Sequence, residues 1–217
     1  MKLVIGNKNY STWSLRPWLL LSAFNVEFEE IQESLAEEGI KERFGQYSPS
    51  GKVPVLIDGE LTVWDSLAIC EYVSEQYLQG RGWPEDRVKR AEARTVCAEM
   101  HSSFMALRNE MPMNCRATRK LEPSIAAKGD IARIDSIWSY YTEQNSPLGP
   151  WLFGEFSIAD CFFAPVASRF STYGVTLSAA AQKYSSLLLK HKSVIAWTEA
   201  AKAEAEIVPR DEAGRPI

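Results

Sequence analysis

The chain has 217 residues, which suffices for one large domain or two small ones, each able to bury a core. Apolar residues make up 46% and charged residues 24%, a balance typical of globular chains that excludes disordered, collagen-like and coiled-coil classes. Against 28 Asp and Glu stand 24 Lys and Arg, a net charge of -4. This balance provides no positive field for a phosphate backbone, so we expect no nucleic-acid partner.

The apolar stretch over residues 15–24 is interrupted by Arg16 and Pro17 and is too short to cross a bilayer. No charged-then-apolar leader precedes it, so we expect a cytoplasmic protein without a membrane partner. The four cysteines lie far apart, with no CxxC motif and no Cys/His cluster: Cys70, Cys97, Cys115 and Cys161. We therefore expect neither a metal site nor a disulfide framework.

Short strand-like and helix-like runs alternate over residues 1–78. In chain order the pattern predicts a strand at 2–6, a helix at 15–24, a strand at 26–31, a polar helix-prone stretch, strands at 53–57 and 61–63, and a helix at 65–78. Asp58-Gly59 between the last two strands is a strong hairpin signal. The resulting β-α-β-α-β-β-α order predicts an α/β domain.

Residues 79–84 (QGRGWP) contain two glycines and a proline, a composition typical of a linker between domains. Beyond the linker, the period-two alternation of strands almost disappears. Helical patterns cover residues 87–111, 124–144, 158–172 and, with interruptions, 179–205. We therefore predict a second, all-helical domain over residues 85–217.

A proline stands near the start of the third predicted strand, in the sequence Lys52-Val53-Pro54-Val55. Because proline cannot donate to a sheet ladder, it is confined to sheet edges and strand starts. One interpretation is a plain edge strand. The other is a cis Val53–Pro54 bond that turns the main chain of Val53 outward, where its N–H and C=O pair with an extended ligand.

Asp65 and Ser66 open the predicted helix at 65–78, and both residue types are favoured helix caps. The same position also suits a ligand, because free N–H groups at a helix start bind a carboxylate. The Ser66 hydroxyl adds a donor, and the Asp65 carboxylate accepts from an ammonium group. The pair thus predicts either a cap or a clamp for an α-amino-acid group.

A loop dense in hydroxyl groups, residues 9–14 (NYSTWS), joins the first strand to the first helix. Ligands of open α/β sheets bind at the carboxyl ends of the strands, where this loop lies. One hydroxyl either caps the helix or donates to a ligand thiolate. Such a donor, together with the helix dipole, lowers a thiol pKa from about 8.5 towards neutrality.

The sequence Ser157-Ile158-Ala159-Asp160 has the pattern of a capping box, so we expect Asp160 to act in folding rather than in chemistry. His101 and His191 lie in separate predicted helices, and we expect neither to be a general base. No GxSxG, P-loop or GxGxxG pattern supports a hydrolase, a nucleotidase or a dinucleotide-binding enzyme.

Together these features resemble the cytosolic glutathione transferase superfamily along essentially the whole chain. Its pattern has a thioredoxin-like β-α-β-α-β-β-α half, a K-V-P-V strand, an acidic-Ser pair opening the third helix, a short linker and an all-helical half carrying F-S-I-A-D. The segment N-Y-S-T-W-S-L-R-P is similar to the start of the serine-type, zeta-like members. When Arg16 is aligned with the arginine of their S-S-C-S-W-R pattern, counting back without gaps aligns Ser11 with their catalytic serine. Trp13 then stands at the position of their cysteine.

The resemblance implies individual roles. Ser11 would stabilise the thiolate of glutathione, with Tyr10 or Thr12 in that role if the register slips by one. Glutathione would be bound by five implied residues. Lys52 would supply a charge, Val53 would pair through its main chain, and Pro54 would form the cis bond. Asp65 and Ser66 would clamp the γ-glutamyl group. The implied lining of the second-substrate pocket is Tyr10, Trp13, Met105, Arg108 and the turn Met111-Pro112-Met113. Arg108 is either a counter-charge for an anionic substrate or an ion-paired or solvated helix residue.

The resemblance therefore implies a homodimeric detoxification enzyme that uses glutathione as co-substrate, without a metal, and presents the thiolate to a small electrophile. One alternative within the same fold is a maleylacetoacetate isomerase-like enzyme, in which the thiolate adds to an unsaturated diacid and then leaves. Another is a glutathione-binding module without turnover.

Overall fold

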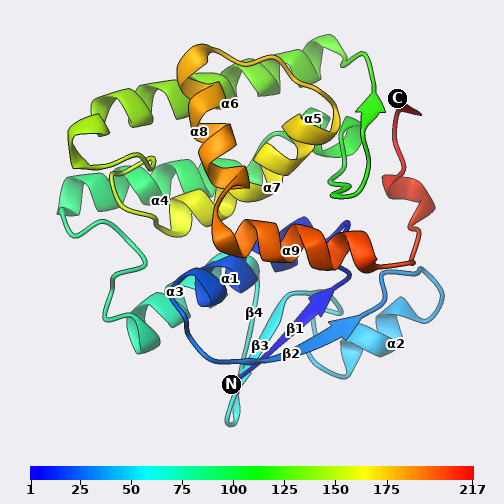
Figure 1. Ribbon diagram of the computed structural model, residues 1–217. Helices are drawn as coiled ribbons and strands as arrows, with labels where there is room; N and C mark the ends of the chain where they lie inside the picture. Colours follow the sequence, from blue (N-terminus) through cyan, green and yellow to red (C-terminus); the bar gives the residue numbers. More distant parts are fainter.

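A four-stranded mixed sheet organises the first part of the chain (Figure 1). The computed structural model describes residues 1–217. The elements of this part follow the predicted order: β1 (Lys2–Gly6), α1 (Thr12–Ala23), β2 (Glu29–Glu33), α2 (Ile40–Gly45), β3 (Val55–Asp58), β4 (Leu61–Trp64) and α3 (Ser66–Tyr77). The strand order is β2-β1-β3-β4, with β1 parallel to β2 and the other neighbours antiparallel.

The central position of β1 explains its continuous apolar run, because Leu3, Val4 and Ile5 are fully buried between two neighbouring strands. The strand predicted at 26–31 begins three residues later, at Glu29. The reason is local: the Val26 N–H bonds to the Leu21 carbonyl at the end of α1, and ladder pairing starts only after it.

Helices form most of the second part of the chain. They are α4 (Arg87–Ser102), α5 (Met105–Glu110), α6 (Ile125–Gln144), α7 (Ile158–Thr172), α8 (Ala179–Leu189) and α9 (Lys192–Ala203), with short 3-10 turns η1 (Ser146–Leu148) and η2 (Pro209–Asp211). The single helix predicted at 87–111 was wrong, because Phe104 adopts a left-handed φ of 65° and separates α4 from α5. No helix is both long and apolar enough to span a membrane.

The second part is helical, as expected, apart from one short pair of strands. Two short strands, β5 (Arg119–Lys120) and β6 (Arg215–Pro216), pair antiparallel and hold the end of the chain. Two residues per strand are too few to show a period of two, so no sequence pattern could reveal them.

Helix α7 carries the core that joins the two parts, since it packs against α1, α4 and α8. Ser157 and Asp160 form the predicted capping box at its start. The Asp160 carboxylate, fully buried, accepts hydrogen bonds from the Ser157 N–H (2.8 Å), the Leu152 N–H (3.3 Å) and the Tyr184 hydroxyl (2.9 Å). Burial raises the pKa of this carboxyl to about 6, and the donors oppose the rise.

We predict that Asp160→Ala lowers the free energy of unfolding by about 2–4 kcal/mol, because it leaves several buried donors without an acceptor. Denaturant unfolding followed by circular dichroism measures the change. Asp86→Ala is the control, since Asp86 is the exposed N-cap residue of α4 and accepts only from N–H groups of its own helix, so its loss should be smaller. Equal losses in the two variants would contradict a central role for Asp160.

Candidate functional site

Seven of the predicted site residues meet at one cavity of about 330 Å³, beside the start of α1. They are Tyr10, Ser11, Thr12, Trp13, Lys52, Val53 and Arg108. The other walls come from the α2 region, from residues 112–113 after α5, from Arg169 on α7 and from Arg210 and Asp211 in η2. The cavity thus combines residues from both parts of the chain.

Ser11 is the N-cap residue of α1, and its side chain makes no capping bond. Its hydroxyl donates to the Ser14 hydroxyl at 2.7 Å, which accepts from the Gly6 N–H at 3.1 Å. A Cβ on Gly6 would lie 2.7 Å from the Leu35 side chain and 3.2 Å from the Ser11 Cβ, so this close approach requires glycine. The Ser11 hydroxyl is therefore held at the start of a helix and at the edge of the cavity.

The Tyr10 hydroxyl is occupied by protein partners. It donates to the Glu212 carboxylate and accepts from the Arg116 guanidinium at 2.9 Å. Burial and the bond to Glu212 raise the pKa of this phenol. The Tyr10 hydroxyl therefore has two charged protein partners, whereas the Ser11 hydroxyl has only the neutral Ser14 hydroxyl, which a ligand thiolate can replace more easily as acceptor.

The Val53–Pro54 peptide bond is cis, as one of the two sequence interpretations predicted. The β3 ladder begins at Val55, so Val53 precedes the paired part of the strand and lines the cavity. Lys52 lies beside it with an exposed side chain.

Asp65 and Ser66 stand at the start of α3, where the predicted cap is confirmed: the Asp65 carboxylate accepts from the Leu67 and Ala68 N–H groups at 2.8 and 3.3 Å. Asp65 has a left-handed φ of 82°, uncommon outside glycine and often found where function constrains the backbone. Its other carboxylate oxygen lies 3.2 Å from His101 Nε2. Neither Asp65 nor Ser66 lines the 330 Å³ cavity.

Trp13 connects the cavity to the start of α3. Its ring lies against that of His101, with the centroids 5.2 Å apart, and His101 in turn pairs with Asp65. Burial lowers the pKa of His101, while Asp65 opposes the shift. No role of His101 could be predicted from the sequence, because a histidine on a polar helix carries no pattern that marks a contact with another element.

Arg16 is a fully buried cation, whose only use in the sequence was to align the first loop with that of the serine-type transferases. Its guanidinium lies between the Trp13 and Phe162 rings, at 4.2 and 4.5 Å from their centroids, and donates to the Ser66 hydroxyl at 3.4 Å. Burial and the charges of Arg108 and Arg169 lower its pKa to about 9. The sequence did contain a signal for this buried cation, because Arg16 stands inside an otherwise apolar helical run.

Arg108 and Arg169 bring positive charge to the cavity wall. Arg108 stacks on Trp13 at 4.8 Å and donates to the Ser103 carbonyl at 2.9 Å. Arg169 is 4% exposed, donates to the Met111 carbonyl at 2.8 Å and keeps one buried nitrogen unpartnered. Neither guanidinium takes part in an ion pair of the structure. Of the two interpretations of Arg108, the one in which it is an ion-paired helix residue is therefore not supported.

The structure places Met105 and Met111 outside this cavity, against expectation. Met105 is 59% exposed on α5, and Met111 is buried and lines a different cavity of about 530 Å³ beside α6. The chain turns after the short helix α5, so the other two residues of the predicted turn, Pro112 and Met113, do line the candidate cavity.

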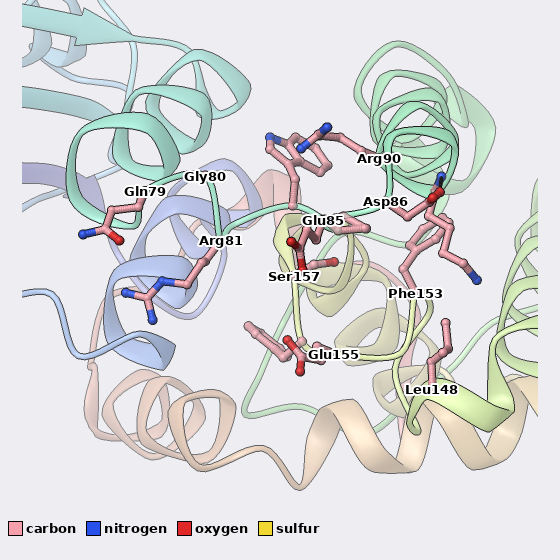
Figure 2. A pocket seen from close by; sticks show the side chains of 14 residues that line it. Gln79, Gly80, Arg81, Glu85, Asp86, Arg90, Leu148, Phe153, Glu155 and Ser157 are labelled. Atoms are coloured by element: carbon pink, nitrogen blue, oxygen red, sulfur yellow. Dashed lines mark hydrogen bonds between the residues drawn. The ribbon is translucent and has the colours of Figure 1, made fainter.

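Another cavity, of about 770 Å³, lies between residues 79–90 and the segment before α7 (Figure 2). Acidic and basic side chains alternate around it, among them Arg81, Glu85, Arg90 and Glu155, and none of the predicted site residues lines it. No group of three or more His, Cys, Asp or Glu side chains lies close enough together to hold a metal ion.

Two family models match the chain. One is described as glutathione S-transferase, N-terminal domain, and matches residues 10–76. The other is described as glutathione S-transferase, C-terminal domain, and matches residues 116–200. Together they cover most of both parts of the fold.

Curated relatives match over shorter segments. A dichloromethane dehalogenase of Methylorubrum extorquens is 40% identical over 60 residues, which are 28% of this chain and 20% of the relative. A probable maleylacetoacetate isomerase of Caenorhabditis elegans is 33% identical over 105 residues, 46% of this chain and 49% of the relative. The matches thus span between a fifth and a half of these relatives.

Solved structures match along nearly the whole chain. A glutathione transferase homolog from Burkholderia with bound glutathione has a TM-score of 0.72 at 23% identity and covers 94% of this chain and 98% of its own. The holo structure of maleylpyruvate isomerase, a bacterial zeta-class protein, has a TM-score of 0.72 at 21% identity, with coverages of 95% and 100%. At these identities the likeness establishes the fold.

We predict that Tyr10→Phe lowers the free energy of unfolding by about 1–2 kcal/mol, because Glu212 loses a donor and Arg116 loses an acceptor. Denaturant unfolding followed by circular dichroism measures this loss. Tyr140→Phe is the control, since that exposed tyrosine makes no side-chain hydrogen bond. Equal stability of wild type and Tyr10→Phe would show that the contacts of this hydroxyl contribute nothing.

Proposed function

Because this chain belongs to the glutathione S-transferase family, we propose that it binds glutathione, holds its sulfur as a thiolate and conjugates it to small electrophiles. The observation that carries the proposal is the joint position of the Ser11 hydroxyl and Val53 on one cavity wall. A cysteinyl unit whose backbone pairs with Val53 would direct its sulfur towards the start of α1.

The γ-glutamyl end of glutathione suits the start of α3. There the Ser66 hydroxyl and main-chain N–H offer donors to a carboxylate, since the Leu67 and Ala68 N–H groups already bond to Asp65, and the second Asp65 carboxylate oxygen offers an acceptor to an ammonium group. The 3.2 Å contact with His101 Nε2 holds the Asp65 carboxylate, and the buried Arg16 donates to the Ser66 hydroxyl. The proposed clamp is linked to the cavity through the contacting Trp13 and His101 rings, which supports its part in the same site.

Activation of the thiol would be electrostatic. A hydroxyl donor at the N-terminus of α1 favours the thiolate over the thiol, because the hydrogen bond and the helix dipole both act on the charged form. The thiolate then attacks an electrophilic carbon, a leaving group departs with its electron pair, and the thiol proton passes to solvent. The cavity contributes positioning and exclusion of water.

Beyond the reaction itself, we propose that the protein is a homodimer, that it is located in the cytoplasm and that it acts in detoxification. Exposed apolar side chains on the outer surfaces of β4, α3 and α4 support self-association: Leu61, Trp64, Tyr77 and Val88. Sedimentation velocity measures the oligomeric state, and a monomer at micromolar concentration would refute the dimer.

A second candidate is glutathione-dependent isomerisation of an unsaturated diacid. The cations Arg108 and Arg169, neither paired with a carboxylate, favour it, since they match the carboxylates of such a substrate. The thiolate would add to the double bond, the resulting single bond would rotate, and elimination of the thiolate would restore the alkene. The isomerase relatives are consistent with this chemistry.

The two candidates predict different substrates. Turnover of 1-chloro-2,4-dinitrobenzene with glutathione tests conjugation, and cis–trans conversion of a maleyl-type diacid tests isomerisation. If the chain is an isomerase, Arg169→Met should raise the KM for the diacid about tenfold or more, because one charge-assisted bond is worth roughly 1.5–3 kcal/mol. Arg169→Lys keeps the charge, so its KM should lie between those of the wild type and Arg169→Met. Glutathione binding without either turnover would favour a non-catalytic module.

We predict that Ser11→Ala raises the pKa of bound glutathione and slows conjugation about ten- to a hundredfold near neutral pH, while affinity for glutathione changes little. The measurement is the conjugation rate against pH. A higher thiol pKa moves the rate profile towards alkaline pH, so the deficit should shrink as pH rises.

Tyr10→Phe and Thr12→Ala serve as parallel variants in this assay. If one of them loses activity while Ser11→Ala keeps the wild-type profile, the activating hydroxyl belongs to that neighbour. If all three keep the profile, main-chain N–H groups and the helix dipole activate the sulfur.

A further inference from the structure

The C-terminal tail, residues 204–217, lies beyond α9 and beyond the family-model match that ends at residue 200. Figure 1 shows it leaving α9, passing above the loop that holds α2 and ending beside the β5 region. It therefore runs along the side of the molecule where both parts of the chain come together.

Two glutamates fix the tail to loops of the sheet domain. The Glu204 carboxylate accepts from the N–H groups of Lys8 at 2.7 Å and Asn9 at 2.9 Å, directly before the hydroxyl-rich loop. The Glu206 carboxylate accepts from the Asn7 amide at 2.6 Å and from the Ala36 N–H at 3.1 Å. The tail thereby takes part in shaping the loop that carries Ser11.

Further bonds fix the tail to the helical part. Arg116 donates to the Glu206 carbonyl at 2.6 Å and to the Glu204 carbonyl, while the Glu212 carboxylate accepts from the Asn114 amide at 2.9 Å and from Arg119. Beyond Glu212, β6 pairs with β5. The segment between these contacts is held from both ends.

That segment contains η2, and its Arg210 and Asp211 side chains line the candidate cavity. Val208 is buried beneath it with Tyr10 and Phe44, so the turn rests on an apolar base. Apart from Tyr10, Arg210 and Asp211, the ionisable residues that line the cavity are the cations Lys52, Arg108 and Arg169. Asp211 is therefore the single acidic side chain facing an otherwise positive space.

We propose that the C-terminal tail is a specificity-determining wall of this cavity, in which the Asp211 carboxylate offsets the charge of Arg169 and Arg210 and weakens the binding of anionic electrophiles. The proposal rests on the proposed glutathione transferase function. Asp211 lies 3.7 Å from the Arg210 Nε, and the Arg210 Nη1 lies 3.5 Å from the carboxylate of the exposed Glu37, which does not line the cavity. Arg169, which does line it, has an unpartnered buried nitrogen. Removing the negative charge should raise the positive potential felt by a ligand.

The test compares matched aromatic ligands with and without a carboxylate, using the full chain saturated with glutathione. Calorimetry measures the Kd of 3,5-dinitrobenzoate and of neutral 1,3-dinitrobenzene. Asp211→Asn should lower the Kd of the anion about three- to tenfold, and Arg210→Gln should raise it by a similar factor, because charge complementarity sets the preference. The Kd of the neutral ligand should not change in either variant.

Glu60→Gln is the control, since it alters the net charge equally at an exposed residue in the turn between β3 and β4. The proposal is overturned if Asp211→Asn leaves the ratio of the two Kd values unchanged, if it shifts both equally, or if neither ligand binds wild type or variant. Turnover is measured separately with 4-chloro-3,5-dinitrobenzoate and 1-chloro-2,4-dinitrobenzene. Absent turnover with both, combined with the expected Kd shifts, would refute conjugation and retain the role of the tail.

Discussion

The burial of α1 between the sheet and α7 is the constraint on which the rest of the structure depends. Leu15, Leu19 and Leu20 are at most 1% exposed, since the helix packs on α3 and β1 on one side and on α7 and α9 on the other. The helix therefore admits no polar face, and its one cation, Arg16, is enclosed by aromatic rings. Because α1 also begins at Ser11, the packing that joins the two parts also fixes the position of the proposed activating hydroxyl.

Much of this arrangement could be predicted from the sequence because its signals are local. The order of strands and helices follows from periodicity, the capping box from four consecutive residues, and the candidate cis Val53–Pro54 bond from a proline near the start of an apolar strand. The hydroxyl-rich loop could be placed at the cavity because it follows a strand directly. Each of these inferences needed only neighbours in sequence.

The features that escaped prediction depend on contacts between distant residues. His101 meets Asp65 from another helix, and Arg169 reaches the cavity from the middle of α7. Of the lining predicted around α5, Arg108, Pro112 and Met113 reach the cavity, while Met105 and Met111 do not, because the predicted continuous helix through residue 111 is interrupted. A left-handed Phe104 changes the direction of the chain, and no propensity indicates such a residue. The tail showed no periodicity at all, because side-chain hydrogen bonds rather than an apolar face hold it.

The bonds from Glu204 to the loop before Ser11 join positions almost at opposite ends of the chain, 196 residues apart for Lys8. During synthesis on the ribosome the sheet domain emerges first, and contacts of such long range form last. The loop that carries the proposed activating hydroxyl therefore acquires these main-chain partners only after the segment that follows α9 has been synthesised. Until then this part of the site is incomplete in a nascent chain.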